Sequence, residues 1–96
     1  MKLNRIALTA SLLAPLALAQ SVSPTEAMVV GNRHYESGEF VEAIDVYETI
    51  VAAGVQDSTL FYNLGNAYFK QGDFGRAILH YRQAQQLAPR DADIET

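Results

Sequence analysis

Two histidines are the residues of this sequence best suited to acid–base chemistry, because an imidazole exchanges its proton near neutral pH. A catalytic histidine works with a nucleophile and an orienting carboxylate held beside it. Neither His34 nor His80 has such partners in a recognisable arrangement. We therefore expect His34 to be partly buried as a packing residue, and His80 to be solvated on the outer side of its helix.

Four glycines raise the question of a phosphate-binding loop, which needs glycines within a few residues of one another. Here they form two widely separated pairs with the same internal spacing, namely Gly31 with Gly38 and Gly65 with Gly72. We expect them to serve close helix packing and turns. The absence of cysteine excludes a thiolate nucleophile, a zinc–thiolate site and a disulfide framework. With two histidines a multi-histidine metal site is disfavoured, so we predict no enzymatic activity, no cofactor and no metal.

The chain has 96 residues and a formal net charge of −4, which allows one small domain. Its basic residues are scattered, so neither nucleic acid nor an anionic membrane surface is an expected partner. We also expect no small-molecule substrate. What remains is a small binding or structural module whose partner is another protein or a second copy of the chain.

The first 19 residues have the layout of a secretory signal peptide. Lys2 and Arg5 precede a fourteen-residue run without charge that ends in Ala17-Leu18-Ala19. As a helix this run would rise only about 21 Å, short of a hydrocarbon core of roughly 30 Å. We expect cleavage near Ala19 and export to the periplasm or cell envelope. The alternative is an uncleaved anchor, and we expect membrane association only through that anchor or through C-terminal sequence not present here.

The sequence matches itself at a fixed offset of about 34 residues, the period of stacked helix–turn–helix units. Identical pairs include Gly31/Gly65, Asn32/Asn66, Gly38/Gly72, Phe40/Phe74, Ala43/Ala77, Ile44/Ile78 and Tyr47/Tyr81. Apolar residues recur at spacings of three and four within each unit, as in amphipathic helices. Glycines stand where the first helix of each pair must end. We predict four helices, at residues 24–37, 40–53, 58–71 and 74–87, with Asp73 as the N-cap of the last.

The second unit resembles the tetratricopeptide (TPR) consensus. The run from Tyr62 to Phe74 carries the resemblance, followed by Ala77, Ile78, Tyr81, Ala84 and Pro89, with Phe61 at the position where the motif usually has Trp. The first unit keeps most of the pattern and departs from it at Ala27, His34, Ile50 and Val55. The resemblance implies an all-α fold, an α-solenoid of two TPR helix–turn–helix units.

We therefore expect five segments. A signal peptide at residues 1–19 and a short linker at 20–23 precede the two repeats, at 24–57 and 58–91. Residues 92–96 are a C-terminal tail or the start of a third repeat. The chain is also similar to exported bacterial TPR proteins, including those of the aerotolerance (Bat) operons. In those proteins the repeats are followed by membrane helices. One interpretation is therefore that the chain is the N-terminal fragment of a longer membrane-anchored TPR protein.

In TPR proteins the first helix of each pair lines a concave surface, and the resemblance carries this onto eight residues: Met28, Asn32, Tyr35, Glu36, Tyr62, Asn66, Phe69 and Lys70. Thr25 and Thr59 complete the same register. Rings and amides suit a peptide or helix of a partner, although Tyr35 and Phe69 equally suit a role in covering neighbouring helices. We thus expect a protein–protein interaction scaffold. A chaperone carboxylate clamp is rejected because Met28 stands where that clamp has Lys.

The charge and the small size favour self-association as the alternative, structural function. Residues 24–57 carry a net charge of −6 and residues 58–91 a net charge of +2, so copies could stack head to tail. Solvated helix faces are the simpler interpretation of these charges. Two repeats bury little apolar surface, and we expect Ala84 and Leu87 to be exposed beside the last helix. The identity of the partner is not encoded in the sequence.

Overall fold

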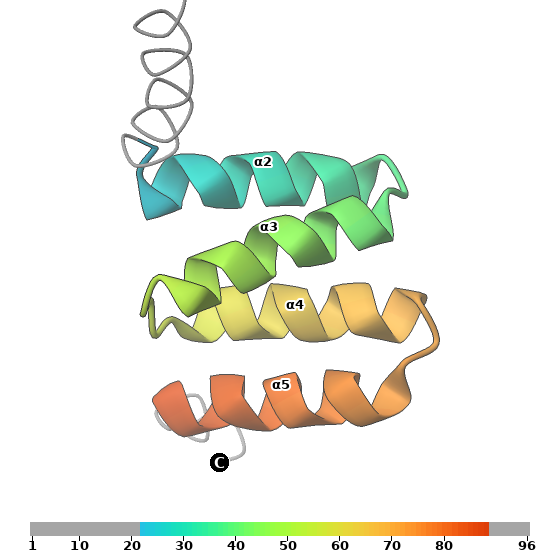
Figure 1. Ribbon diagram of the computed structural model, residues 1–96. Helices are drawn as coiled ribbons and strands as arrows, with labels where there is room; N and C mark the ends of the chain where they lie inside the picture. Colours follow the sequence, from blue (N-terminus) through green and yellow to red (C-terminus); the bar gives the residue numbers. More distant parts are fainter. Residues whose placement is uncertain (1–21, 89–96) are drawn as a thin grey trace, which may run out of the picture.

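Residues 22–88, the part described in the computed structural model, form four α-helices and no strand (Figure 1). The helices are α2 (Pro24–Glu36), α3 (Phe40–Ala52), α4 (Ser58–Lys70) and α5 (Phe74–Leu87). Each helix begins at its predicted residue and ends within one residue of the predicted end. The all-α fold is therefore confirmed. The expected signal peptide (1–19) and C-terminal tail (92–96) lie outside the described residues.

Local sequence sets the helix ends. Ser23 and Glu26 form a capping box, in which each side chain accepts a hydrogen bond from the other residue's backbone N–H. Asp57 caps α4 through the amide of Leu60, and Asp73 caps α5 as predicted. The turns after α2, α3 and α4 each hold a glycine with positive φ, at Gly38 (79°), Gly54 (95°) and Gly72 (83°). A side chain would be strained at these positions.

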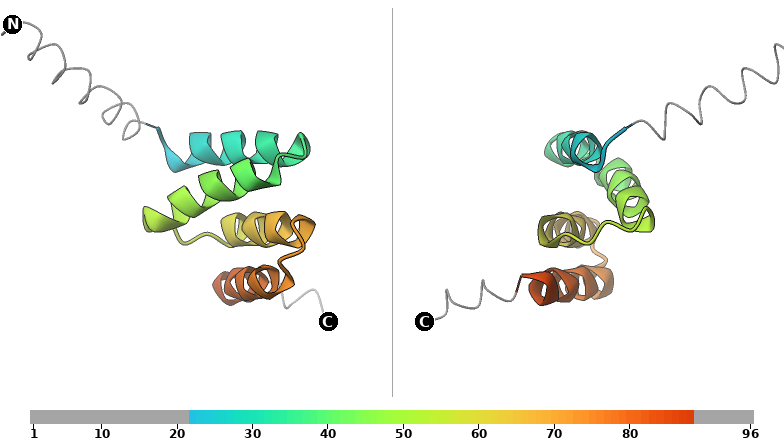
Figure 2. Two further views of the ribbon diagram at one scale, coloured as in Figure 1. Left: turned by 45° about the vertical axis from the view of Figure 1, so that its right-hand side comes forward. Right: turned by 90° about the vertical axis from the view of Figure 1, so that its left-hand side faces the viewer.

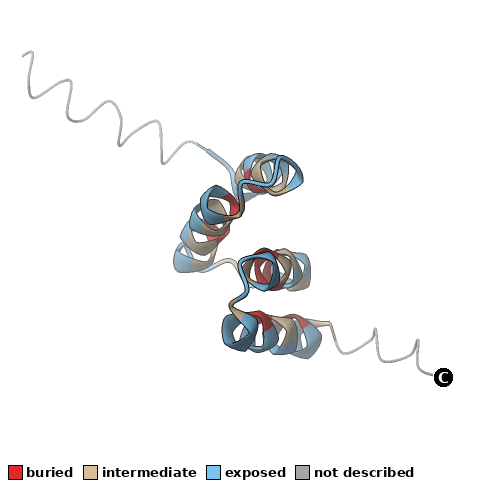
Figure 3. Ribbon diagram, turned by 90° about the vertical axis from the view of Figure 1, so that its right-hand side faces the viewer, coloured by how far each residue is buried: buried red, intermediate tan, exposed pale blue. Residues whose placement is uncertain are grey.

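The helices form two hairpins, α2 with α3 and α4 with α5, and the hairpins stack through α3 and α4. Figures 2 and 3 show α2 and α4 on one side of the stack and α3 on the other. The largest buried cluster lies at the junction between the hairpins and consists of Ala43, Tyr47, Ile50, Leu60, Leu64 and Ala67. Because α3 and α4 share this core, each repeat stabilises the other.

Two glycines allow the helices of each hairpin to approach closely. A Cβ atom on Gly31 would lie 2.5 Å from the ring of Tyr47. One on Gly65 would lie 2.7 Å from the ring of Tyr81. Both distances are far below van der Waals contact, so the role in close packing predicted for these glycines is confirmed.

Two predictions about the last helix are wrong. His80 is buried, with 8 % of its surface exposed, and is not solvated. Ala84 is also buried, with 8 % of its surface exposed. The repeat gives the reason, because these residues are the counterparts of Val46 and Ile50, which belong to the core or pack against it. Leu87, in contrast, is 41 % exposed, as predicted.

The prediction for His34 is confirmed. Its side chain is one-third exposed, and Nδ1 lies 2.7 Å from a carboxylate oxygen of Glu39, just beyond the end of α2. Among the helices of residues 22–88, none is long and apolar enough to span a bilayer.

Candidate functional site

A groove of about 240 Å³ lies between α2 and α4. It is lined by Asn32, Tyr35 and Glu36 from α2, by Asn63 and Asn66 from α4, and by Tyr47 from α3. Three of these six side chains are carboxamides. The groove is therefore polar at its centre, with an aromatic ring and a carboxylate at the α2 edge.

Hydrogen bonds from two tyrosines fix the orientation of two of the carboxamides. The hydroxyl of Tyr47 donates to Oδ1 of Asn32 at 2.5 Å, and the hydroxyl of Tyr81 donates to Oδ1 of Asn66 at 2.6 Å. The two pairs occupy equivalent positions of the two repeats. Because a tyrosine hydroxyl holds each Oδ1, the NH₂ group of each asparagine has a defined direction and is the donor that it can offer a ligand.

The tyrosine hydroxyls remain protonated donors throughout the physiological pH range. Burial, reinforced by the charges of Tyr35 and Glu36, raises the pKa of Tyr47 to about 12. Burial also raises the pKa of Tyr81, with a smaller contribution from Tyr62. The orientation of both asparagine amides is consequently independent of pH near neutrality.

A third carboxamide supplies the opposite hydrogen-bonding function. Nδ2 of Asn63 donates to Oδ1 of Asn32 at 3.2 Å, which leaves Oδ1 of Asn63 as an acceptor. The carboxylate of Glu36 is a second acceptor in the groove. Together with the NH₂ groups of Asn32 and Asn66, the groove thus offers donors and acceptors that match the C=O and N–H groups of a peptide backbone.

Half of the eight residues predicted for the concave surface line this groove, namely Asn32, Tyr35, Glu36 and Asn66. Met28 is instead partly buried and packs against the core. Tyr62 and Phe69 are 55 % and 53 % exposed on α4, and Lys70 is exposed at its end. Helical spacing places Tyr62, Asn66, Phe69 and Lys70 along one face of α4.

The two aromatic rings beside the ends of the first helices do contact the following helix. The rings of Tyr35 and Phe40 lie 5.2 Å apart edge to face, and those of Phe69 and Phe74 lie 5.2 Å apart. Each ring therefore partly covers its own hairpin and still has exposed surface. The covering role considered for Tyr35 and Phe69 is thus confirmed, and their binding role stays a prediction.

Two residues of the groove were not predicted as binding residues. Tyr47 was named only as part of the repeated pair Tyr47/Tyr81, and Asn63 only as part of the run that resembles the TPR consensus. The signal for Tyr47 was present in the sequence, because Asn and Tyr recur fifteen residues apart in both repeats (Asn32/Tyr47 and Asn66/Tyr81). Asn63 has Val29 as its counterpart, so no repeat pattern marked it.

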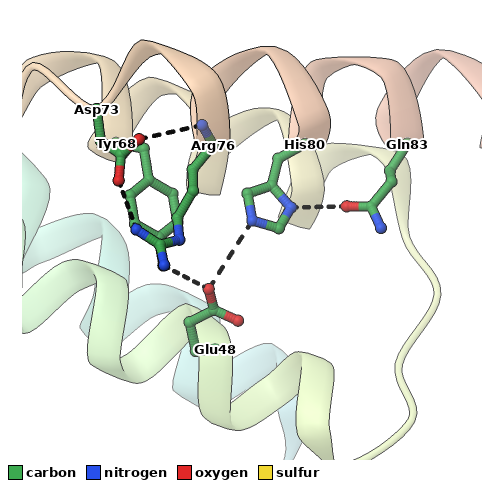
Figure 4. A network of polar contacts seen from close by, with 6 residues as sticks. All are labelled: Glu48, Tyr68, Asp73, Arg76, His80 and Gln83. Atoms are coloured by element: carbon green, nitrogen blue, oxygen red, sulfur yellow. Dashed lines mark hydrogen bonds and ion pairs between the residues drawn. The ribbon is translucent and has the colours of Figure 1, made fainter.

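A second polar cluster connects the two repeats on the side of α3 and α5 (Figure 4). The hydroxyl of Tyr68 donates to Glu48 at 2.6 Å, and Nε2 of His80 lies 3.8 Å from the same carboxylate. The imidazole stacks against Phe61 and Tyr68, and its Nδ1 lies 2.6 Å from Gln83. Burial, followed by the bond to Glu48, raises the pKa of Tyr68 to about 12.

This second cluster links the two hairpins. Glu48 comes from α3, whereas Tyr68 and His80 come from α4 and α5. The cluster thus ties the two hairpins together beside the shared core. The nearby guanidinium of Arg76 pairs with Asp73 at 2.7 Å and lies 5.8 Å from the ring centroid of Tyr68. Within residues 22–88 no three His, Asp or Glu side chains are grouped so as to hold a metal ion.

Two family models match the chain. The model described as tetratricopeptide repeat matches residues 58–91, and the model described as TPR repeat matches residues 31–72. A comparison with curated proteins gives no significant match. The two family matches together with the stacked hairpins identify residues 31–91 as tetratricopeptide repeats, a module that generally mediates binding between proteins and is typically not enzymatic. The matched part of the chain, residues 31–91, therefore consists of tetratricopeptide repeats.

Proposed function

We propose that the chain binds an extended segment of a partner protein in the groove between α2 and α4. The observation that carries this proposal is the orientation of Asn32 and Asn66 by the hydroxyls of Tyr47 and Tyr81. Two preoriented NH₂ groups suit carbonyl oxygens of a peptide backbone, and an acceptor on Asn63 suits a peptide N–H. Because the donors are held before the ligand arrives, little conformational entropy is lost on binding.

The surroundings of the groove extend the contact beyond the backbone. On α4, Tyr62 and Phe69 flank Asn66 at helical spacing and present rigid, half-exposed rings for apolar side chains of the ligand. Glu36 and Lys70 occupy equivalent positions of the two repeats and carry opposite charges. A ligand with a basic side chain near Glu36 and an acidic one near Lys70 would therefore bind in a single direction.

We place this function in the bacterial cell envelope, because residues 1–19 have the layout of a signal peptide. The test is to express the whole chain in a bacterium, separate the periplasmic fraction and measure the intact mass. Cleavage after Ala19 predicts a periplasmic chain that begins at Gln20, and Ala19→Lys should block its processing. Recovery of the uncleaved chain in the cytoplasm would contradict the location without affecting the groove.

The binding proposal is tested with a displayed library of random linear peptides, panned against the chain. Peptides are counted as groove ligands when wild type retains them and the variant Asn32→Ala with Asn66→Ala does not. The matched control is Gln56→Ala with Gln86→Ala, two exposed carboxamides that do not line the groove. The control should retain every enriched peptide. If all enriched peptides bind the asparagine variant as well as wild type, the groove is not the binding site.

A further inference from the structure

The end of the stack formed by α5 exposes a cluster whose counterpart in the first repeat is covered. The outer cluster consists of Phe69, Phe74 and Ile78, which are 53 %, 56 % and 53 % exposed. The inner cluster consists of the equivalent residues Tyr35, Phe40 and Ile44, which are all partly buried. The rings have the same 5.2 Å separation in both clusters. The difference in exposure therefore comes from what lies over each cluster.

In the first repeat the cover is helix α4. Tyr35 and Ile44 pack against the core cluster, to which α4 contributes Leu60, Leu64 and Ala67. In Figure 1, α5 is the last described helix of the stack, so no described helix plays this part for the outer cluster. By analogy with α4, the partner that fits α5 is a helix whose apolar residues have the spacing of Leu60, Leu64 and Ala67.

The charge of the face is reversed between the two repeats. On α3 the covered stripe carries Glu48, which accepts a hydrogen bond from Tyr68 of α4. The equivalent residue of α5 is Arg82, which is exposed. Helix α5 contains no acidic residue between Phe74 and Leu87. A helix that lies on α5 as α4 lies on α3 would therefore need an acidic side chain at the position equivalent to Tyr68.

A second copy of the chain does not meet these requirements. In head-to-tail stacking, α2 of the next copy would bring Glu26 and Arg33 to the positions of Leu60 and Ala67, which are 1 % and 0 % exposed. Burying two charged side chains without partners is costly. The same stacking would place His34 opposite Arg82. A symmetric contact between two copies of α5 would oppose cationic helices with no acid on either.

We propose that the outer face of α5, formed by Phe74, Ile78, Arg82 and Gln85 with Phe69 beside it, binds an amphipathic helix of a different protein. The bound helix carries apolar residues at i, i+4 and i+7 and an acidic residue at i+8, opposite Arg82. Gln85 stands where α3 has Val51, so this face is more polar than the one between the repeats. A more polar face suits a partner that binds reversibly. None of these residues lines the groove between α2 and α4, although Phe69 lies beside both surfaces.

The test uses a labelled helical peptide that copies residues 57–71 with Tyr68→Glu, titrated with the full chain and followed by fluorescence anisotropy. The new carboxylate would lie against Glu48 if the peptide replaced α4, so this change directs the peptide to α5. A second peptide carries Tyr68→Gln. The wild-type chain should bind the first peptide about two- to fivefold more tightly, the range expected of one exposed ion pair. With Arg82→Glu in the chain the order should reverse.

Two further variants locate the site. Ile78→Asp, at an exposed position that should not affect folding, is expected to abolish saturable binding of both peptides. Arg33→Glu makes the same change of charge on α2 and should keep the wild-type preference. Circular dichroism verifies the helicity of each variant.

Each of four results would overturn the proposal. The first is the absence of saturable binding, and the second is equal affinity of the wild-type chain for both peptides. The third is self-association of the chain that is lost in the variant Ile78→Asp. The fourth is binding of the peptides to the variant Ile94→Asp but not to the wild-type chain. The third result would identify a second copy as the occupant of the face. The fourth would identify the chain's own C-terminal residues.

Discussion

The hydroxyl of Tyr47 donates a hydrogen bond to the side-chain oxygen of Asn32, and the same bond recurs in the second repeat between Tyr81 and Asn66. Each tyrosine also lies against the glycine that precedes its asparagine, Gly31 or Gly65. The close approach of the two helices in a hairpin and the orientation of a groove amide thus depend on one aromatic ring. This relationship links the packing of the repeat to its proposed binding surface.

Removal of the tyrosine hydroxyl should weaken peptide binding without unfolding the chain. In Tyr81→Phe the ring still packs on Gly65, but the amide of Asn66 is free to turn. We expect the affinity for groove-selected peptides to fall about five- to tenfold, the equivalent of roughly 1 kcal/mol for one hydrogen bond. Tyr62→Phe removes a hydroxyl from an exposed ring of the same face and is the matched control. Equal losses in both variants, measured by calorimetry, would contradict an orienting role for Tyr81.

Two glycine substitutions should change stability in opposite directions. Gly65→Ala forces a Cβ against the ring of Tyr81 at 2.7 Å and near the carbonyl of Ala77 at 3.2 Å. We expect it to lower the free energy of unfolding by about 1–3 kcal/mol, as for an overpacked core. Gly75→Ala, on α5, meets nothing closer than 4.0 Å and should raise it by up to about 1 kcal/mol through helix propensity. Urea denaturation of both variants checks the prediction, which fails if Gly65→Ala is as stable as wild type.

The two histidines should differ strongly in their contribution to stability. His80→Ala removes a buried ring from between Phe61 and Tyr68 and leaves Glu48 with one contact fewer. We expect a loss of about 2–4 kcal/mol, below the range for larger buried aromatic rings. His34→Ala removes a partly exposed side chain and should cost about 0–1 kcal/mol. Comparable losses for both variants in thermal or urea unfolding would show that His80 is not part of the packed interior.

Acid should destabilise the chain through its helix caps. Hydrogen bonds from Ser23 lower the pKa of Glu26 from its ordinary 4.5, and hydrogen bonds from Arg76 lower the pKa of Asp73 from its ordinary 3.8. Since both pKa values are lower in the folded chain than in the unfolded chain, the unfolded chain takes up protons first as the pH falls. The contribution of the caps is complete above about pH 5 and is lost progressively below that value.

Amide variants test this origin of the acid sensitivity. Glu26→Gln with Asp73→Asn keeps side chains that can cap a helix but do not take up a proton between pH 5 and pH 3. The unfolding free energy of this double variant should vary less between pH 5 and pH 3 than that of wild type. An unchanged pH profile would assign the acid sensitivity to other carboxylates.

The bounds of the helices could be predicted closely because the same pattern of residues occurs in both repeats. Gly38 and Gly72 mark the same turn in both repeats, and the apolar stripes from Phe40 and Phe74 coincide when the repeats are aligned. The prediction for His80 was wrong because it followed the polar character of histidine, whereas the alignment of the repeats places this residue at a packed position. Its counterpart Val46 packs against the core, and the stacking of the imidazole on two rings satisfies the same position.

The groove could be predicted only in part. The resemblance to TPR proteins placed Asn32 and Asn66 on the concave surface, because both lie on the first helix of a repeat at equivalent positions. The direction in which their amides point depends on the tyrosine hydroxyls of the second helices, which the spacing of either helix alone does not reveal. Met28 was assigned to the groove by the same register, but its long side chain packs against the core.

The most direct test of the central claim is a titration of isotope-labelled chain with a groove-selected peptide, followed through the side-chain NH₂ signals of asparagine and glutamine. The account predicts that the signals of Asn32 and Asn66 move with the same dissociation constant, whereas those of Gln85 and Gln86 on α5 do not move. Peptide binding that leaves the Asn32 and Asn66 signals in place while shifting those of α5 would contradict it.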